Sequence, residues 1–154
     1  MNKKTLLPCI LLLISLIACK VSFITGYDLI IDQTTTKIKR DFALFEIKIQ
    51  RALITSDKAK DQDFNNYQDF YDNLDVDLKV LEDRSVTLPK KSGDVQNEIK
   101  NISKQILGFK KLHQIGFEDL TDLKKDDHRD LFNAVNSTLD ALLKLQERLK
   151  TTGK

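Results

Sequence analysis

Apolar residues recur at alternating spacings of three and four along four separate stretches of the chain, and this periodicity constrains the fold more than any other feature. Residues with this spacing return to the same face of an α-helix, so each stretch predicts a helix with one apolar stripe. Further apolar residues beside each stripe widen it beyond the seam of a two-stranded coiled coil, which favours a globular bundle. The predicted stripes are Ile31, Thr35, Ile38, Phe42, Phe45, Ile49 and Ala52; Phe64, Tyr67, Tyr71, Leu74, Leu78 and Leu81; Val95, Ile99, Ile102, Ile106 and Phe109; and Leu131, Val135, Thr138, Leu142, Leu145 and Leu149.

The breaks between the stripes fall where helices should end. Pro89 follows the second stripe, and a residue before proline avoids the helical conformation. Asp61 is a suitable N-cap for the second helix. Connections this short favour antiparallel neighbours. The sequence therefore predicts an all-α domain, an up-down-up-down antiparallel four-helix bundle over residues 27–150, with breaks near residues 55–61, 87–93 and 116–125 and a flexible tail at 151–154.

The N-terminus has the pattern of a secretory signal peptide. Asn2, Lys3 and Lys4 form a polar, positive start, and the fourteen residues from Thr5 to Ala18 are nearly all apolar. A positive start followed by an apolar run of this length is typical of a signal peptide. The run is shorter than the roughly 20 apolar residues that a membrane-spanning helix needs. We therefore expect residues 1–18 to be a cleaved leader.

The leader ends Leu16-Ile17-Ala18-Cys19, which resembles the lipobox of bacterial lipoproteins. The resemblance implies cleavage before Cys19, a diacylglycerol on the Cys19 thiol and a lipidated tether over residues 19–26. Lys20 resembles the residue that follows the cysteine in outer-membrane lipoproteins, whereas inner-membrane lipoproteins commonly carry aspartate there. The expected location is thus the cell envelope, at the outer membrane, facing either the periplasm or the cell surface. The alternative is an uncleaved anchor with an incidental cysteine.

The helical domain itself matches no family by a motif. Its lysine-, aspartate- and isoleucine-rich helices, together with the leader, loosely resemble small helical surface lipoproteins of spirochaetes. Loss of Lys3 and Lys4 with the leader would lower the number of lysines and arginines from 25 to 23, equal to the 23 aspartates and glutamates. A neutral exported domain has no electrostatic reason to bind nucleic acid.

No motif predicts an enzyme, a cofactor or a metal site. The sequence contains no nucleophile elbow, Walker loop, dinucleotide fingerprint or zinc-protease motif. Neither His113 nor His128 has a glutamate three residues before it, as bundle metal sites typically require. Cys9 would leave with the leader and Cys19 would be acylated, so no free thiol would remain. We therefore expect a non-catalytic protein.

The second helix is acidic and its neighbours are basic. One interpretation is that complementary charged faces pair the helices. The sharper interpretation is an acidic strip that binds a basic partner, because complementary charge steers association. Phe70 lies off the predicted stripe among polar residues and is a candidate contact residue. The candidate partner-binding residues are Asp69, Phe70, Asp72 and Asp77.

Two functions compete for the domain. The first is a membrane-anchored, non-catalytic protein-binding module whose partner is an envelope protein or, on the cell surface, a host component. The alternative is a small-ligand-binding or enzymatic bundle with its site in the interior. Such a site needs polar groups that converge at core positions. Only Thr35 and Thr138 interrupt the apolar stripes, which favours the binding module.

Replacement of Cys19 tests the proposed processing. We expect Cys19→Ala to abolish labelling by a fatty-acid analogue and to release the protein from the membrane fraction, because the thiol is the predicted acyl acceptor. Labelling of intact and variant protein in growing cells measures this directly. Unchanged labelling of the variant would contradict the lipobox.

Overall fold

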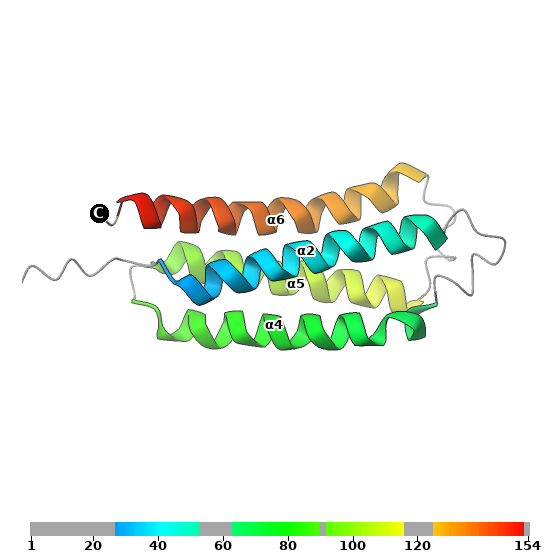
Figure 1. The fold of residues 1–154 in the computed structure, drawn as a ribbon, viewed down its shortest axis with the longest axis horizontal. Coiled ribbons are helices and arrows are strands. Elements are labelled where there is room, and N and C mark those ends of the chain that lie inside the picture. Colours follow the sequence, from blue (N-terminus) through cyan, green and yellow to red (C-terminus); the bar gives the residue numbers. More distant parts are fainter. Residues whose placement is uncertain (1–26, 53–62, 90–91, 116–124, 153–154) are drawn as a thin grey trace, which may run out of the picture.

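The computed structural model describes residues 27–52, 63–89, 92–115 and 125–152, with only the backbone described for 125–128. This part of the chain is helical and contains no strand, which confirms the predicted all-α class (Figure 1). Cys19, the leader, the tether and Asp61 lie outside the described residues. The elements are α2 (Leu29–Ala52), the 3₁₀ turn η1 (Phe64–Tyr67), α4 (Gln68–Thr87), α5 (Gly93–Ile115) and α6 (Lys125–Thr152).

The four α-helices form an antiparallel bundle (Figure 1). Each helix packs on the next in sequence, and α6 packs back on α2 and so closes the ring. Successive helices run in opposite directions, which confirms the predicted up-down-up-down order. Tyr27 and Thr152 consequently lie at the same end of the bundle. We call this end, which also holds Thr87 and Gly93, the Tyr27 end, and the opposite end, which holds Ala52, Phe64 and Ile115, the Ala52 end.

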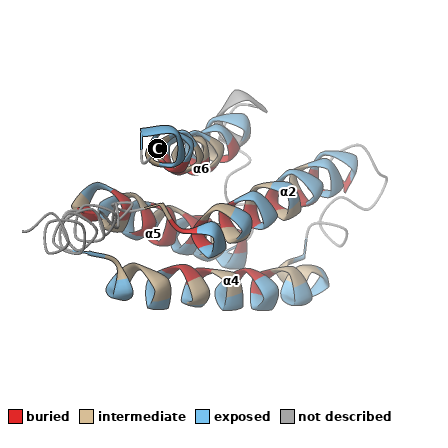
Figure 2. Cartoon of the chain, turned by 60° about the vertical axis from the view of Figure 1, so that its left-hand side comes forward, coloured by how far each residue is buried: buried red, intermediate tan, exposed pale blue. Residues whose placement is uncertain are grey.

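The inward faces of α2, α4 and α5 follow the predicted stripes (Figure 2). All seven predicted residues of the first stripe are buried in α2. The α4 stripe is buried from Tyr71 to Leu81, while Phe64 and Tyr67 pack on the core from its edge. All five predicted residues of the third stripe are buried in α5, and His113 continues it. Burial of these stripes confirms the helical periodicity.

The predicted stripe of α6 is partly wrong: Val135 and Leu142 are buried as predicted, but the centre of the buried face is rotated from the predicted one. The buried residues are Phe132, Val135, Leu139, Leu142 and Gln146. The predicted members Leu131, Thr138, Leu145 and Leu149 are only half-buried beside them. Apolar residues lie on both overlapping faces of this helix, so periodicity alone does not choose between them. The position of the Phe132 ring shows which face of α6 is buried. This ring lies 4.9 Å from the Phe109 ring and 5.4 Å from the Phe42 ring, in the centre of the bundle.

The helix ends show why the chain breaks where it does. Leu88 has φ −69° and ψ 150°, the extended conformation that precedes proline, and α4 therefore ends at Thr87 as Pro89 predicts. Asp63 caps η1 by accepting a hydrogen bond of 2.8 Å from the backbone N–H of Asn65. The helix α6 continues to Thr152, so the predicted tail begins two residues too early.

Asp28 joins three helices at the Tyr27 end. Its Oδ1 accepts hydrogen bonds from the backbone N–H groups of Ile30 (2.9 Å) and Ile31 (3.1 Å), which makes Asp28 the N-cap of α2. Its Oδ2 pairs with the Arg84 guanidinium at the end of α4. Its backbone N–H donates to the buried Oε1 of Gln146 on α6 at 2.9 Å. We call Asp28, Arg84 and Gln146 the Asp28 cluster.

Loss of the Asp28 side chain should destabilise the bundle. We expect Asp28→Ala to lower the free energy of unfolding by about 2 kcal/mol, because two backbone N–H groups lose their cap. Asp28→Asn retains an oxygen for the cap and loses only the ion pair to a half-exposed arginine, so it should cost about 0.5 kcal/mol. Urea unfolding followed by circular dichroism measures both. Equal losses would contradict the capping role.

Candidate functional site

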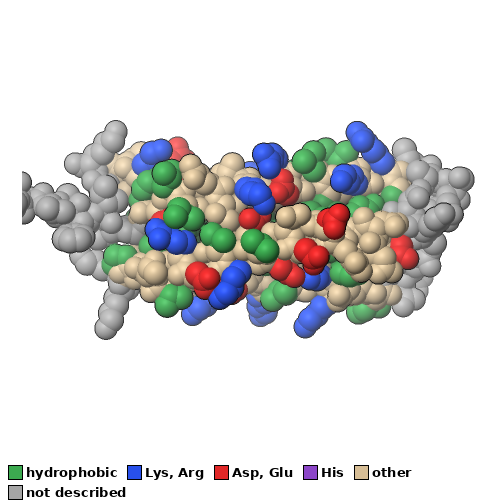
Figure 3. All heavy atoms as spheres, turned by 60° about the horizontal axis from the view of Figure 1, so that its bottom comes forward, with side chains coloured by type: hydrophobic (Ala, Val, Ile, Leu, Met, Phe, Trp, Pro, Cys, Tyr) green, Lys and Arg blue, Asp and Glu red, His purple; other side chains and the backbone are tan. Residues whose placement is uncertain are grey.

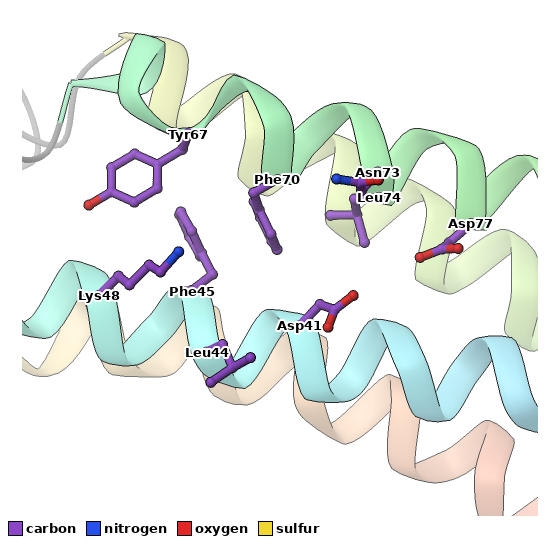
Figure 4. Close-up of a pocket in the computed structure, with 9 residues that line it drawn as sticks. All are labelled: Asp41, Leu44, Phe45, Lys48, Tyr67, Phe70, Asn73, Leu74 and Asp77. Atoms are coloured by element: carbon purple, nitrogen blue, oxygen red, sulfur yellow. The ribbon is translucent and has the colours of Figure 1, made fainter.

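A hollow of about 170 Å³ lies between α2 and α4, in the half of the bundle nearer the Ala52 end. Both helices contribute side chains that face one another across it (Figure 4). We call it the α2–α4 groove. Its lining residues are Asp41, Leu44, Phe45, Lys48, Tyr67, Phe70, Asn73, Leu74 and Asp77.

The floor of the groove is aromatic. The Phe70 ring stacks on the Phe45 ring with centroids 4.3 Å apart and planes 2° from parallel. The Tyr67 ring meets Phe45 edge-on at 5.1 Å. The prediction that Phe70 stands in a polar face is therefore wrong, since its ring is half-buried against the core. Its spacing of three after Tyr67 and four before Leu74 already indicates a position beside the stripe.

Some acidic residues of α4 form ion pairs with lysines of the neighbouring helices. Asp77 bonds to Lys37 of α2, and Asp41 lies 3.5 Å from the same lysine. The hydrogen bond to the Asp77 carboxylate raises the pKa of Lys37. Asp75 bonds to Lys110 of α5 at 2.6 Å. For Asp75 and Asp77, the interpretation that complementary charges pair the helices is confirmed.

Asp69 and Asp72 behave differently from Asp77. Both are exposed, and neither carboxylate bonds to a cation within the described residues. Successive helical residues turn by about 100°, so these two point away from the groove while Phe70 and Asp77 line it. The four candidate residues therefore do not form one site. Phe70 and Asp77 line the groove, whereas Asp69 and Asp72 are a pair of unpaired carboxylates on the outward side of α4.

His113 is a buried titratable residue that the predicted α5 stripe did not include. Its side chain is buried, and its Nδ1 lies 2.8 Å from the Tyr71 hydroxyl in a hydrogen bond. The rings of Phe64 and Tyr67 lie 5.5 Å and 5.4 Å from the imidazole. The spacing of four after Phe109 is the signal that places His113 on the α5 stripe. The side chain of His128 lies outside the described residues.

More polar groups are buried in the interior than the two threonines that the stripes suggested. Thr35 is buried as expected, whereas Thr138 is half-buried at the edge. Ser103, His113 and Gln146 are buried as well. All of these buried groups bond within the protein: Thr35 to the Ile31 carbonyl (2.7 Å), Ser103 to Glu82 (3.0 Å), His113 to Tyr71 (2.8 Å) and Gln146 to the Asp28 N–H (2.9 Å).

Comparison with protein-family models, with curated proteins and with solved structures finds no match for this chain. Among the described residues, no helix is both long and apolar enough to cross a membrane. In the same part of the chain, no three histidine, cysteine or acidic side chains gather as a metal site would require.

The buried Tyr71 hydroxyl should make stability depend on alkaline pH. Burial raises the pKa of Tyr71, and the nearby Tyr67 adds to the rise. A raised pKa in the folded state gives stabilisation that is complete below the ordinary value of about 10 and is lost as the pH rises. Above that pH, we expect the unfolding free energy of the intact protein to fall more steeply than that of Tyr71→Phe.

The difference should reach about 1.4 kcal/mol per pH unit, because one additional proton is released on unfolding. Urea unfolding of both proteins over a pH series measures it. Below about pH 9 the two should differ by a constant amount, which reports the lost hydrogen bond to His113. Parallel curves at all pH values would contradict the raised pKa.

Proposed function

We propose that this chain is a membrane-anchored bacterial lipoprotein whose helical bundle is a non-catalytic protein-binding module of the cell envelope. The leader and Cys19 support the anchor. The observation that carries the binding role is the α2–α4 groove, which combines an aromatic floor with exposed apolar and charged side chains at its edge. Leu44, on its α2 side, is 53% exposed although it is a large apolar residue.

The size of the groove favours recognition of one side chain over a small ligand. Small-ligand sites typically enclose about 300–1,000 Å³. The α2–α4 groove, at about 170 Å³, has room for one large side chain. Protein interfaces commonly place an aromatic or aliphatic anchor in a pocket of this kind, where it contributes much of the affinity. We therefore propose that a partner inserts one apolar side chain between α2 and α4.

The unpaired acidic side chains on the outward side of α4 favour a basic partner segment. Asp69 and Asp72 are exposed and unpaired within the described part of the chain, so no lysine of the protein competes there with a partner's cations, whereas Lys48 lines the groove itself. Figure 3 shows acidic and basic side chains intermixed over this face of the bundle, so the attraction is local and does not come from a broad field of one sign. Complementary charges of this type speed association and fix orientation.

An interior ligand or catalytic site finds less support. The buried side chains of Thr35, Ser103, His113 and Gln146 each bond to another group of the protein, so they do not converge on an empty space. The centre of the bundle is filled by apolar side chains from all four helices. A protein-binding function needs only an exposed surface, and the α2–α4 groove provides one.

Site-specific crosslinking tests the groove. A photoreactive residue in place of Leu44 should crosslink to a discrete protein in intact cells, because Leu44 lines the groove. The same residue in place of Leu107, which is 46% exposed on α5, should not. Leu44 is a better probe than Phe70, whose replacement would remove a ring stacked on the core.

Charge reversal completes the experiment. We expect the double variant Asp69→Lys and Asp72→Lys to reduce the Leu44 crosslink by about tenfold while lowering stability by no more than about 1 kcal/mol, because both residues are exposed and Asp69 lies in the first turn of α4. The matched control reverses Asp130 and Glu147, two exposed acidic residues of α6. Equal crosslinking from Leu44 and Leu107, or equal loss in both double variants, would rule out this face.

A further inference from the structure

The Tyr27 end of the bundle exposes large apolar side chains in its outermost helical turns. Leu29 and Ile30, in the first turn of α2, are 54% and 41% exposed. Val86, the residue before the last of α4, is 79% exposed. These three side chains lie outside the hydrophobic core. The Asp28–Arg84 ion pair joins the start of α2 to the end of α4, the two helix ends on which they lie. Three of the eight large apolar side chains that are exposed in the described part of the chain lie at this end. Exposed apolar patches mark sites of contact with membranes or other proteins.

A tyrosine and a lysine accompany them. The Nζ atom of Lys150, near the end of α6, lies 5.6 Å from the centre of the Tyr27 ring. Tyrosine rings are enriched at the boundary between lipid and water, where the ring contacts apolar groups and the hydroxyl meets water. Lysine can lay its methylene stem on apolar surface while its charge stays hydrated. The Tyr27 end thus has the side-chain types that suit a lipid surface.

The chain also enters the bundle at this end. Residues 1–26 precede Tyr27, and Cys19 is eight residues before it. Eight residues span at most about 28 Å when fully extended. A lipid on Cys19 would therefore keep the Tyr27 end within that distance of the bilayer, and the effective concentration of lipid at this end would be high.

We propose that the Tyr27 end docks on the lipid surface through Leu29, Ile30 and Val86, so that the bundle stands on end above the membrane. This inference rests on the lipid anchor proposed above. It adds a second contact with the bilayer, made by the folded domain itself. Apolar insertion of this kind adds to the affinity that the acyl chains provide.

The charges near this end indicate that the contact is apolar and not electrostatic. Asp83 bonds to Lys79 at 2.6 Å, and Asp28 pairs with Arg84. The other exposed charges of the terminal turns have both signs, so neutral lipids suffice and salt should have little effect. They are Glu82, Asp94 and Glu147, which are acidic, and Arg148 and Lys150, which are basic.

Docking in this orientation directs the α2–α4 groove away from the membrane. Phe70 precedes Val86 by sixteen residues on α4. At 1.5 Å per residue the floor of the groove then stands about 24 Å farther from the lipid than Val86. The groove would be open to a partner in the aqueous phase.

The absence of tryptophan from the chain allows a direct test. Val86→Trp places the single tryptophan of the variant at the Tyr27 end. Ile115→Trp is the matched control, because Ile115 is a 66% exposed aliphatic residue in the last turn of α5 at the Ala52 end. Each variant of the full chain is purified in its lipidated form and incorporated into phosphatidylcholine vesicles that contain brominated phosphatidylcholine, which quenches nearby tryptophan.

We expect brominated lipid to reduce the emission of Val86→Trp at least threefold more than that of Ile115→Trp, at low and high salt alike. Leu29→Trp should behave as Val86→Trp does. Equal quenching of the two ends, or no quenching of Val86→Trp and Leu29→Trp in protein that floats with the vesicles, would overturn the docking inference alone. Quenching that disappears in high salt would also overturn it. Protein that fails to float with vesicles would overturn the lipid anchor and this inference with it.

Discussion

Buried polar groups at the two ends of the bundle fix how its helices are aligned along one another. Apolar stripes of regular spacing can slide by seven residues and still bury similar side chains, as in coiled coils, where a single polar residue selects the register. Here Asp28 meets Arg84 and Gln146 at one end, and Tyr71 meets His113 at the other. A slide would leave these groups buried without partners, at about 1–3 kcal/mol for each. The groove depends on this alignment.

The sequence predicts most of this fold because burial in a bundle follows the helical period. The stripes of α2, α4 and α5 could be read from spacing alone, and Pro89 marked the end of α4. The rotation of α6 about its own axis could not be predicted from spacing, because its apolar residues cover two overlapping faces. Contacts with residues far away in sequence choose between them: Phe132 packs among rings of other helices, and Gln146 reaches Asp28.

The candidate site was harder to predict, because it depends on which side of each helix meets its neighbour. The acidic residues of α4 look alike in sequence. Asp77 faces Lys37 and is paired, whereas Asp69, two turns earlier, faces solvent. Nothing in the α4 sequence alone makes that distinction. The stacking of Phe70 on Phe45 likewise joins residues 25 positions apart, and it turns an expected surface contact into the floor of a groove.

The Asp28 cluster also has a mechanical consequence. A force applied to the chain before Tyr27 enters the folded domain at Asp28, the residue that caps α2. Because Asp28 bonds to α4 and α6 as well, the load is shared among three helices before any turn of α2 can unwind. A force applied at Thr152 meets only the final turn of α6, where Thr151 and Thr152 bond to the Arg148 carbonyl of their own helix. The bundle should therefore resist pulling from its N-terminus better than from its C-terminus.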